Sequence, residues 1–254
     1  MPRFFIKVDQ INEDKIYIVG DDAFHISRSL RMAAGENITV CDDSGVEYDC
    51  VLEEFLQDRV GARIVSTRPS ESEPPFVAHV YQGLPKGDKL ETVIQKAVEC
   101  GARSVTTFES EFCIVKSKPE SEKNKLERRI KIAHNAAQQS GRGVLPDVYP
   151  TVSFASMLDK ASKADIKLFC YEGEGTLPIG AYLKGDDFKS FFEKNGRRPE
   201  VSIVVGSEGG FSRSEAKLAA DKGFLMCGLG KRILRTETAA TFALCCLIYE
   251  SELS

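Results

Sequence analysis

Residues 201–215 read VSIVVGSEGGFSRSE and residues 229–241 read LGKRILRTETAAT, and these two stretches are the most informative part of the chain. In the first, an apolar run rich in β-branched residues ends in a turn made of Gly206, Ser207, Glu208, Gly209 and Gly210. Ser212 follows, with Glu215 three residues later, which is the capping-box spacing that begins a helix. A strand, a glycine turn and a helix in this order let a ligand reach main-chain N–H and C=O groups, because glycine has no Cβ in the way. The first stretch therefore predicts a ligand-binding turn at the end of a buried strand.

The second stretch combines a glycine turn with charged and hydroxyl side chains. Gly230 is followed by the cations Lys231, Arg232 and Arg235, and then by a hydroxyl–acid–hydroxyl triplet at residues 236–238. Either stretch alone is compatible with an ordinary tight turn. The occurrence of both in this order is the more specific signal.

Together the two stretches resemble the C-terminal signature of the SPOUT (trefoil-knot) methyltransferases. Within that superfamily they are similar to the RsmE family, which methylates N3 of a uridine in small-subunit ribosomal RNA. The resemblance covers nearly the whole chain, through RFF at residues 3–5, HISRSLR at 25–31, QKAVECG at 95–101 and QSGR at 139–142. The chain departs from the family at Ser207, where proline is usual, and at Cys100, where leucine is common. The glycines, Glu208 and the LRTETA run are intact.

The resemblance implies an α/β fold in two domains. A small PUA-like β-barrel that binds RNA would occupy residues 1–70. A SPOUT-type trefoil-knot methyltransferase domain, a parallel sheet with flanking helices and a C-terminal knot, would occupy residues 71–254. The composition of residues 66–75, STRPSESEPP, independently predicts a linker between the two parts.

Hydrophobic periodicity predicts the elements on each side of this linker. Before it, we expect a helix over residues 23–32 and short strands at 3–8, 15–19, 37–41, 47–53 and 59–66. After it, we expect helices at 88–100, 121–139 and 239–249, and strands at 76–81, 104–108, 166–171, 201–206 and 223–227. Strands that alternate with helices predict a parallel sheet. The last helix is apolar nearly all round, which predicts burial on several sides, including a dimer interface.

The resemblance implies S-adenosyl-L-methionine as the cofactor, held largely by main-chain groups. The implied cofactor-binding residues are Gly206, Ser207, Glu208, Gly209, Gly210, Leu225, Gly228, Leu229, Gly230, Leu234, Thr236, Thr238 and Ala239. For the leucines, packing in the core is an equally good interpretation. Neither GxGxxG after the first strand nor GxxxxGK[ST] occurs, which disfavours a Rossmann-type or P-loop site.

Methylation at N3 of uracil requires loss of the N3 proton, so a base or a cation near the target would help. Glu208 and Glu237 are the carboxylates in the two stretches, and Arg235 is the neighbouring cation. We take these three as candidate catalytic residues. A helix-capping role for Glu237, with an ion pair to Arg235, is the alternative.

The net charge of −4 does not exclude RNA, because binding depends on a local basic surface. Residues 116–142 carry such an excess, which could equally be a solvated helix face. The candidate RNA contacts are Arg3, His25, Arg28, Arg31, Lys89, Lys96 and Arg142. Phe4 or Phe5 could stack on a base, although a place in the barrel core is the alternative.

The amino-acid composition indicates which other kinds of site and segment to expect. Eight cysteines form no CxxC pair and only three histidines are present, so no metal site is predicted. We find neither an apolar run long enough to cross a bilayer nor a secretory signal, and we expect a cytoplasmic protein. The resemblance further implies a homodimer that acts on small-subunit rRNA. Two other functions remain open: a knot methyltransferase acting on a different RNA position, and a non-catalytic RNA- or ribosome-binding module.

Overall fold

The structure, a computed structural model, describes residues 1–117, 119–194 and 196–254 and divides into two compact units. Unit 1 comprises Met1–Glu73 and Ala137–Leu145. Unit 2 comprises Pro74–Ala136 and Pro146–Ser254. Each unit has its own sheet and its own hydrophobic core.

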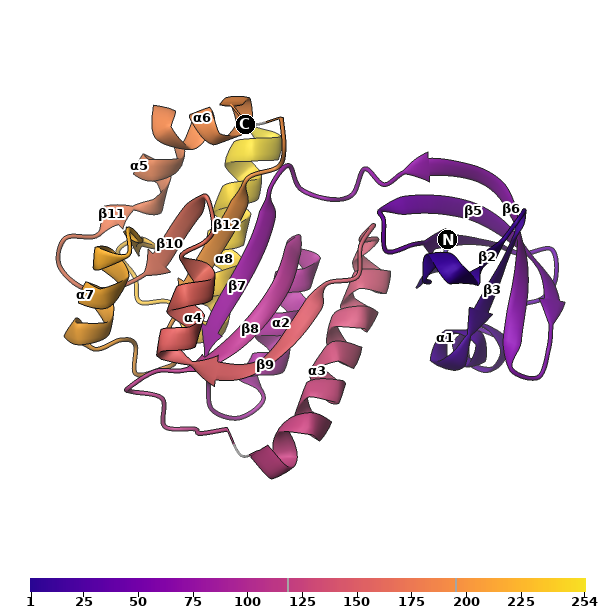
Figure 1. Ribbon diagram of the computed structural model, residues 1–254, viewed down its shortest axis with the longest axis horizontal. Helices are drawn as coiled ribbons and strands as arrows, with labels where there is room; N and C mark the ends of the chain where they lie inside the picture. The colour runs from indigo at the N-terminus through magenta and orange to yellow at the C-terminus, as the bar shows by residue number, and fades with distance from the viewer. Residues whose placement is uncertain (118, 195) are drawn as a thin grey trace. The chain divides into compact units, whose positions relative to one another are not determined.

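Unit 1 is built on a curled sheet of six strands in the order β1-β4-β5-β6-β3-β2 (Figure 1). The strands are β1 (Arg3–Phe5), β2 (Ile11–Asn12), β3 (Lys15–Val19), β4 (Asn37–Cys41), β5 (Val46–Phe55) and β6 (Arg59–Pro69). β1 pairs with β4 in parallel, and the other pairs are antiparallel. The expected small β-rich unit at the N-terminus is confirmed.

Alternating side chains produce the core of unit 1. In β3, Ile16 and Ile18 are buried while Tyr17 between them is partly exposed, which is the period-2 pattern of a half-buried strand. The expected helix over residues 23–32 is instead the short helix α1 (Gly20–Phe24), followed by a π-helical turn (His25–Ser29) that buries Ile26. Phe4 is 1% exposed and belongs to this core, so it is not a base-stacking surface.

The start of the expected linker is part of a strand. β6 continues to Pro69, and residues 66–69 pair with β5, so the linker prediction is wrong for these residues. Pro69 is tolerated because it is the last residue of the strand, where a missing N–H costs little. Ser70 then donates a hydrogen bond to Glu47, which fixes the chain immediately beyond the strand.

Unit 2 contains a seven-stranded, all-parallel sheet in the order β11-β13-β10-β12-β7-β8-β9. Its strands are β7 (Val77–Gly83), β8 (Ala102–Glu109), β9 (Asp147–Ser153), β10 (Ile166–Cys170), β11 (Leu177–Pro178), β12 (Glu200–Val205) and β13 (Leu225–Gly228). β12 lies between β10 and β7 in the sheet, although four strands, β8 to β11, separate β7 from β12 in the sequence. The expected parallel α/β sheet is confirmed.

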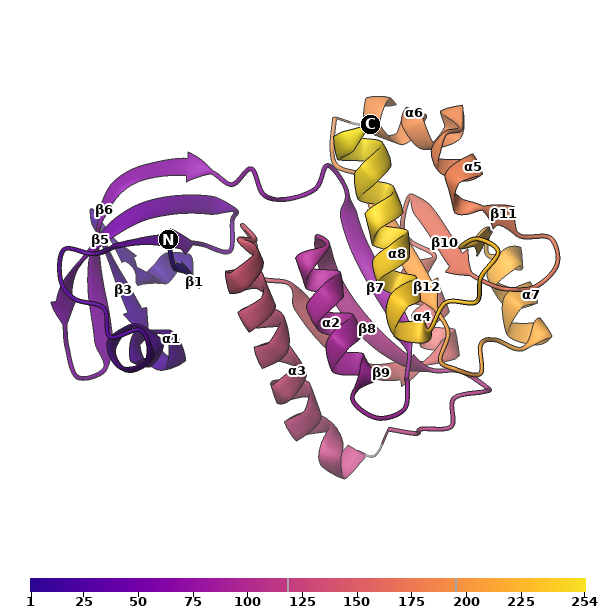
Figure 2. The same cartoon turned by 180° about the vertical axis from the view of Figure 1, so that it is seen from behind.

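Helices cover both faces of this sheet. α2 (Lys89–Glu99) and α8 (Thr236–Ile248) pack side by side on one face, and α4 (Phe154–Ala161) covers the other (Figures 1 and 2). The remaining helices are α3 (Pro119–Ser140), α5 (Ile179–Leu183), α6 (Asp186–Lys194) and α7 (Arg213–Asp221). The capping box at the start of α7 is confirmed, because the Ser212 hydroxyl accepts from the Glu215 N–H and the Glu215 carboxylate accepts from the Ser212 N–H.

The last helix is less completely buried than its composition predicts. Leu244 and Leu247 are buried, whereas Phe242 is 37% and Tyr249 60% exposed. Cys245 is also exposed, and Tyr249 begins a π-helical segment (Tyr249–Leu253) that continues α8. These three side chains therefore form an apolar stripe along one side of the helix and its continuation. Apolar surface that stays in contact with water does not contribute to the stability of a folded monomer.

Candidate active site

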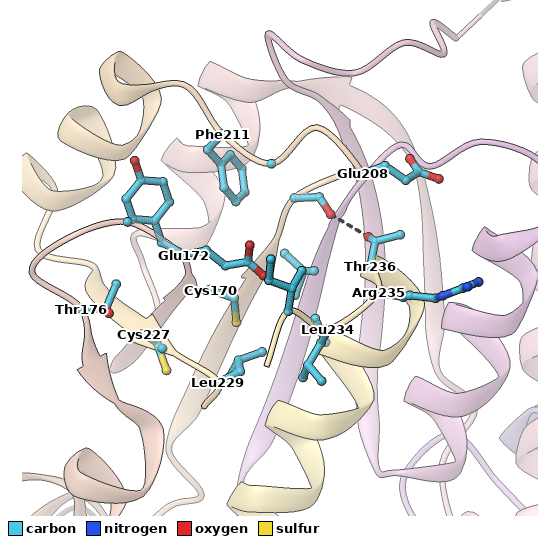
Figure 3. A pocket seen from close by; sticks show the side chains of 18 of the residues that line it. Cys170, Glu172, Thr176, Glu208, Phe211, Cys227, Leu229, Leu234, Arg235 and Thr236 are labelled. Atoms are coloured by element: carbon cyan, nitrogen blue, oxygen red, sulfur yellow. Dashed lines mark hydrogen bonds between the residues drawn. The ribbon is translucent and has the colours of Figure 1, made fainter. Parts of the chain in front are cut away.

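A cavity of about 770 Å³ lies in unit 2, where the carboxyl ends of β10, β12 and β13 meet. It is enclosed by three segments: the loop 171–176 after β10, the glycine turn (residues 206–210) after β12, and the loop 228–235 between β13 and α8 (Figure 3). All these strands are parallel, so their carboxyl ends share one edge of the sheet, where α/β proteins bind ligands. The volume of the cavity is typical of a site that binds a small molecule.

The floor of the cavity is apolar. Leu229, Leu234, Cys170 and Cys227 line one side of it, and Phe211 lines it apart from them (Figure 3). Burial raises the pKa of the Cys227 thiol to about 12, and burial also raises the pKa of Cys170 well above its ordinary value. Both thiols are therefore neutral and behave as small apolar groups rather than nucleophiles.

The start of α8 is joined to the glycine turn. The Thr236 hydroxyl donates a hydrogen bond of 2.6 Å to the main-chain carbonyl of Gly206 (Figure 3). Thr236 is the first residue of α8, and its neighbour Arg235 is the N-cap, whose carbonyl accepts from the N–H groups of residues 238 and 239. The two stretches singled out in the sequence are thus in direct contact.

Glu208 is held by partners on and near α2. Its carboxylate accepts 2.7 Å from the Lys89 ammonium and 3.2 Å from the Lys86 N–H. Burial alone would raise the pKa of Glu208, but these hydrogen bonds outweigh it and hold the pKa below its ordinary value. A carboxylate so stabilised is a weak proton acceptor, so the geometry favours a role in positioning the turn over a role as general base.

The other two candidate catalytic residues differ in placement. Arg235 lines the cavity and is exposed, with its guanidinium directed away from Leu229 and Leu234 (Figure 3). Glu237 lies in the first turn of α8 and does not line the cavity. One of its carboxylate oxygens, Oε2, is buried without a hydrogen-bond partner among the described residues, and its carboxylate complements the helix dipole.

Most of the expected cofactor-binding residues line this cavity. They are Gly206, Ser207, Glu208, Gly209, Gly210, Gly228, Leu229, Gly230, Leu234, Thr236 and Ala239. Leu225 and Thr238 do not line it, and we correct those two assignments. Leu225 is the first residue of β13, at the end of the strand opposite the cavity, and Thr238 is exposed on the outer side of α8.

Sequence reasoning missed the segment that follows β10. The cavity is lined here by Cys170, the last residue of β10, and by Tyr171, Glu172, Gly173 and Thr176, none of which the sequence had predicted. A signal was present, because the expected strand at residues 166–171 runs directly into the glycine-containing sequence EGEG. That pattern repeats the strand-and-glycine-turn arrangement that identified residues 206–210.

The expected RNA contacts on unit 1 fall into two groups. His25 at the start of the π-helical turn, Arg28 within it and Arg31 just beyond it are all exposed. Arg3, in contrast, donates 2.6 Å to the buried carboxylate of Glu47 and 3.1 Å to the Arg142 carbonyl. Its guanidinium is therefore engaged inside the unit, so we assign it a structural role.

Arg142 is also structural. Its side chain is 3% exposed and forms a two-point ion pair with Glu73, through Nε at 2.8 Å and Nη2 at 2.6 Å. Reaching a phosphate would require this buried pair to break, which is strongly unfavourable. The expectation that Arg142 binds a phosphate is corrected accordingly.

In unit 2 the expected RNA contacts lie on α2. Lys89 lines the cavity and pairs with Glu208, whereas Lys96 is partly exposed and pairs with Glu99 at 2.7 Å. The basic segment 116–142 is only partly a free cationic surface. Arg129 is buried beside Glu122, Arg128 pairs with Glu91, and Lys118 lies outside the described residues.

The described residues offer neither a metal site nor a membrane-spanning helix. Over the described part of the chain, no group of three or more His, Cys, Asp or Glu side chains is arranged to hold a metal ion. No helix in residues 1–117, 119–194 and 196–254 is both long and apolar enough to cross a membrane.

The cavity-bearing unit and the curled sheet both match known protein families. An RNA methyltransferase domain model matches residues 72–248, and an RNA methyltransferase PUA domain model matches residues 18–54. The ribosomal RNA small subunit methyltransferase E of Bacillus subtilis (strain 168) is 35% identical over 259 residues, covering 100% of this chain and 98% of that protein. The protein of the same name from Synechocystis is 30% identical over 243 residues, covering 95% of this chain and 75% of that protein.

A solved structure extends the comparison to the fold. The crystal structure of a ribosomal RNA small subunit methyltransferase E from Neisseria gonorrhoeae, bound to S-adenosyl methionine, matches with a TM-score of 0.81 at 28% identity. The match covers 98% of this chain and 97% of that chain. The similarity therefore includes both units and every segment around the cavity.

Proposed function

This chain belongs to the ribosomal RNA small subunit methyltransferase E (RsmE) family, and from that membership we propose that it transfers a methyl group from S-adenosylmethionine to N3 of a uridine in small-subunit rRNA. The observation that carries the proposal is the cavity at the carboxyl ends of β10, β12 and β13, closed by the glycine turn and the start of α8. The match to the whole of the Bacillus subtilis protein supports the same reaction class.

The residues around the cavity fit this cofactor. The glycine turn and the loop 228–235 offer main-chain N–H and C=O groups to an adenine edge, and Leu229 and Leu234 offer apolar contact to its ring. The Ser207 hydroxyl lines the cavity and is buried without a hydrogen-bond partner in the described residues, so it is available to a polar ligand atom. When bound, S-adenosylmethionine would supply an electrophilic methyl group on a positively charged sulfur.

The chain's own residues would place the uracil and handle its charge. The N3 proton belongs to a neutral imide and must leave before or during the attack on the methyl group. Arg235, at the rim of the cavity, would stabilise the negative charge that develops on the ring. Glu208 would fix the glycine turn through Lys89. Glu237 lies outside the cavity in the first turn of α8, where its carboxylate would stabilise the start of that helix.

We propose that residues 1–70 bind the RNA and residues 71–254 carry out the transfer. The exposed cluster of His25, Arg28 and Arg31 supports this division, because it lies outside the cavity-bearing unit. The substrate would place the protein in the cytoplasm with the ribosomal subunits.

Replacing Arg28 and Arg31 together by alanine is expected to weaken RNA binding and to leave the affinity for S-adenosylmethionine unchanged. If each arginine contacts one phosphate, the slope of log K against log salt should become shallower by about 1.4 to 1.8. A filter-binding titration at several salt concentrations measures this slope. The double variant Arg59→Ala with Arg63→Ala is the matched control, since it removes the same charge from exposed positions of β6. An equal change in both double variants would mean that only net charge matters.

We also propose that the protein is a homodimer, formed through the apolar stripe made of Phe242 and Cys245 of α8 and Tyr249 just beyond it. Burying the stripe against a second copy would remove apolar surface from water. Phe242→Glu is expected to convert the dimer to a monomer in sedimentation-velocity experiments. Leu218→Glu, which changes a leucine of α7 that is 52% exposed, should leave the mass unchanged. A wild-type protein that sediments as a monomer would refute the proposal.

The reaction is tested by methyl transfer from labelled S-adenosylmethionine to unmodified small ribosomal subunits, with naked 16S rRNA and large subunits in parallel. Digestion and mass spectrometry would locate the product. A single 3-methyluridine in the small subunit is the expected result. Cofactor binding without any product on these RNAs would favour a methyltransferase for another RNA position, and failure to bind the cofactor would favour a non-catalytic binding module.

A further inference from the structure

A glutamine beneath the cavity makes an unusual set of contacts. Gln82 is the sixth residue of β7, is 0% exposed and does not line the cavity. Its side-chain Nε2 lies 2.7 Å from the Thr236 hydroxyl, 3.1 Å from the Gly206 carbonyl and 3.0 Å from the Gly83 carbonyl. One buried amide therefore links the end of β7, the glycine turn and the start of α8.

The orientation of this amide follows from its neighbours. The carbonyl oxygens of Gly206 and Gly83 can only accept, so the –NH2 end of Gln82 must face them. The opposite atom, Oε1, is buried without a hydrogen-bond partner among the described residues. A buried acceptor left unpaired is unfavourable. The two N–H groups of the amide, shared among the three acceptors within hydrogen-bond distance, must more than offset it.

The Gly206 carbonyl is the point at which these contacts converge. It accepts from Gln82 Nε2 and, at 2.6 Å, from the Thr236 hydroxyl, which itself accepts from Gln82. Both lone pairs of the carbonyl are occupied by donors fixed to β7 and α8. Because the peptide unit is planar, fixing the direction of this carbonyl also fixes the direction of the Ser207 N–H at the start of the turn.

The backbone of β7 supports the same peptide unit from another direction. A Cβ added to Gly83 would lie 2.5 Å from the Ser207 nitrogen and 2.9 Å from the Gly206 carbonyl carbon. Only glycine permits this approach, so the end of β7 is pressed directly against the first peptide of the glycine turn. The position and the orientation of that peptide are thus both set by residues 82 and 83.

We propose that Gln82 is a positioning residue for the cofactor cavity, which holds the Gly206–Ser207 peptide and Thr236 in the arrangement that binds S-adenosylmethionine. This inference rests on the proposed function. Gln82 acts through these two partners and does not itself contact the ligand. Its loss should therefore reduce cofactor affinity by more than the loss of an equally buried polar group elsewhere in the sheet.

The test compares Gln82→Met, which keeps the length of the side chain and removes its donors, with Thr107→Val. Thr107 is the partner of Gln82 in the β7–β8 register, is 3% exposed and bonds to Thr151 rather than to the cavity. Isothermal titration calorimetry would measure S-adenosylmethionine affinity, and thermal unfolding would measure stability. Both variants should lose stability, but only Gln82→Met should lose about tenfold or more in affinity.

A double-mutant cycle with Thr236→Val tests whether the two residues act on the same group. If both act by holding the Gly206 carbonyl, the loss in the double variant should be clearly smaller than the product of the two single losses. Thr236→Ser keeps the hydroxyl and should therefore lose less affinity than Thr236→Val. Fully multiplicative losses would overturn the shared role.

If Gln82→Met does not fold, Gln82→Glu tests the same hydrogen bonds through their dependence on pH. A protonated glutamic acid can still donate one hydrogen bond, whereas the carboxylate can donate none and would face two carbonyl oxygens. Its cofactor affinity should therefore fall with rising pH while that of the wild type stays level. A wild-type affinity in Gln82→Met, or a flat pH profile in Gln82→Glu, would overturn the positioning role. A wild-type protein that binds no cofactor would instead overturn the proposed function and this inference with it.

Discussion

Replacing Gly230 by arginine is expected to abolish S-adenosylmethionine binding while leaving the fold intact. Gly230 lines the cavity with φ at +110°, and an added Cβ would meet no atom within 4 Å. The backbone conformation is unfavourable for arginine by about 1–3 kcal/mol, which most domains tolerate. The long cationic side chain would then occupy the cavity and repel the positively charged sulfur. We expect a loss in affinity of about 100-fold or more by calorimetry.

Gly35→Arg is the matched control for this variant. Gly35 lies in unit 1 at φ +92°, with no atom within 4 Å of an added Cβ, so it imposes the same kind of strain and the same charge outside the cavity. The two variants should unfold at similar temperatures, and only Gly230→Arg should fail to bind. Retained affinity in Gly230→Arg would show that the cavity is not the cofactor site.

Elements with a strong hydrophobic period could be predicted from the sequence nearly residue by residue. β3 has the predicted bounds, because Ile16 and Ile18 alternate with outward residues. α2 lies within one residue of its predicted ends, because Leu90, Ile94 and Ala97 recur on one buried face. In both cases the local pattern and the tertiary burial agree, which is the condition under which pattern reasoning works.

β9 could not be predicted, although it is part of the main sheet. Its sequence DVYPTVS contains Pro150, which argues against a strand in the interior of a sheet. β9 lies at the edge next to β8, and their pairing shifts register between Thr106 and Phe108. An edge strand has a neighbour on one side only, so fewer of its N–H groups must donate hydrogen bonds to another strand. The proline, which lacks an N–H, is therefore tolerated there. Whether a segment is an edge or an interior strand depends on strand order, which a local pattern does not contain.

The site was predictable where it depends on local sequence and not where it depends on strand order. The glycine turn follows an apolar run directly, so its role could be inferred from residues 201–215 alone. Cys170 and Glu172 line the same cavity only because β10 lies between β12 and β13. Gln82 bonds to Gly206 because β7 is the other neighbour of β12. The contacts that organise the cavity join residues far apart in the chain.

Arg142 illustrates the same limit for charged residues. From its sequence context, at the end of a basic helix, it was assigned to phosphate binding. The structure pairs it with Glu73, a residue 69 positions earlier, in a site from which water is largely excluded. Both side chains are buried, at 3% and 8% exposure, so this pair should matter for stability far more than a surface pair.

Glu73→Gln is therefore expected to destabilise unit 1 by about 3–5 kcal/mol. The substitution deprives a buried guanidinium of its carboxylate, and it also weakens the bonds that Glu73 accepts from the N–H groups of Gly143 and Val144. Urea unfolding of the full chain, followed by near-ultraviolet circular dichroism, would measure the loss. Cofactor affinity at low urea concentration should stay near that of the wild type, since the cavity lies wholly in unit 2.

Two further variants test whether the loss of stability comes from the unpaired buried charge or from substituting a charged residue in general. Lys217→Met removes one partner of an exposed pair with Asp221 on α7, and it should cost less than about 0.5 kcal/mol. Combining Glu73→Gln with Arg142→Met should restore part of the lost stability, because no buried charge is then left without a counter-charge. If Glu73→Gln cost no more than Lys217→Met, the pair would contribute little to folding. Arg142 would then regain its place among the candidate RNA contacts, because a weakly held guanidinium could turn toward a phosphate.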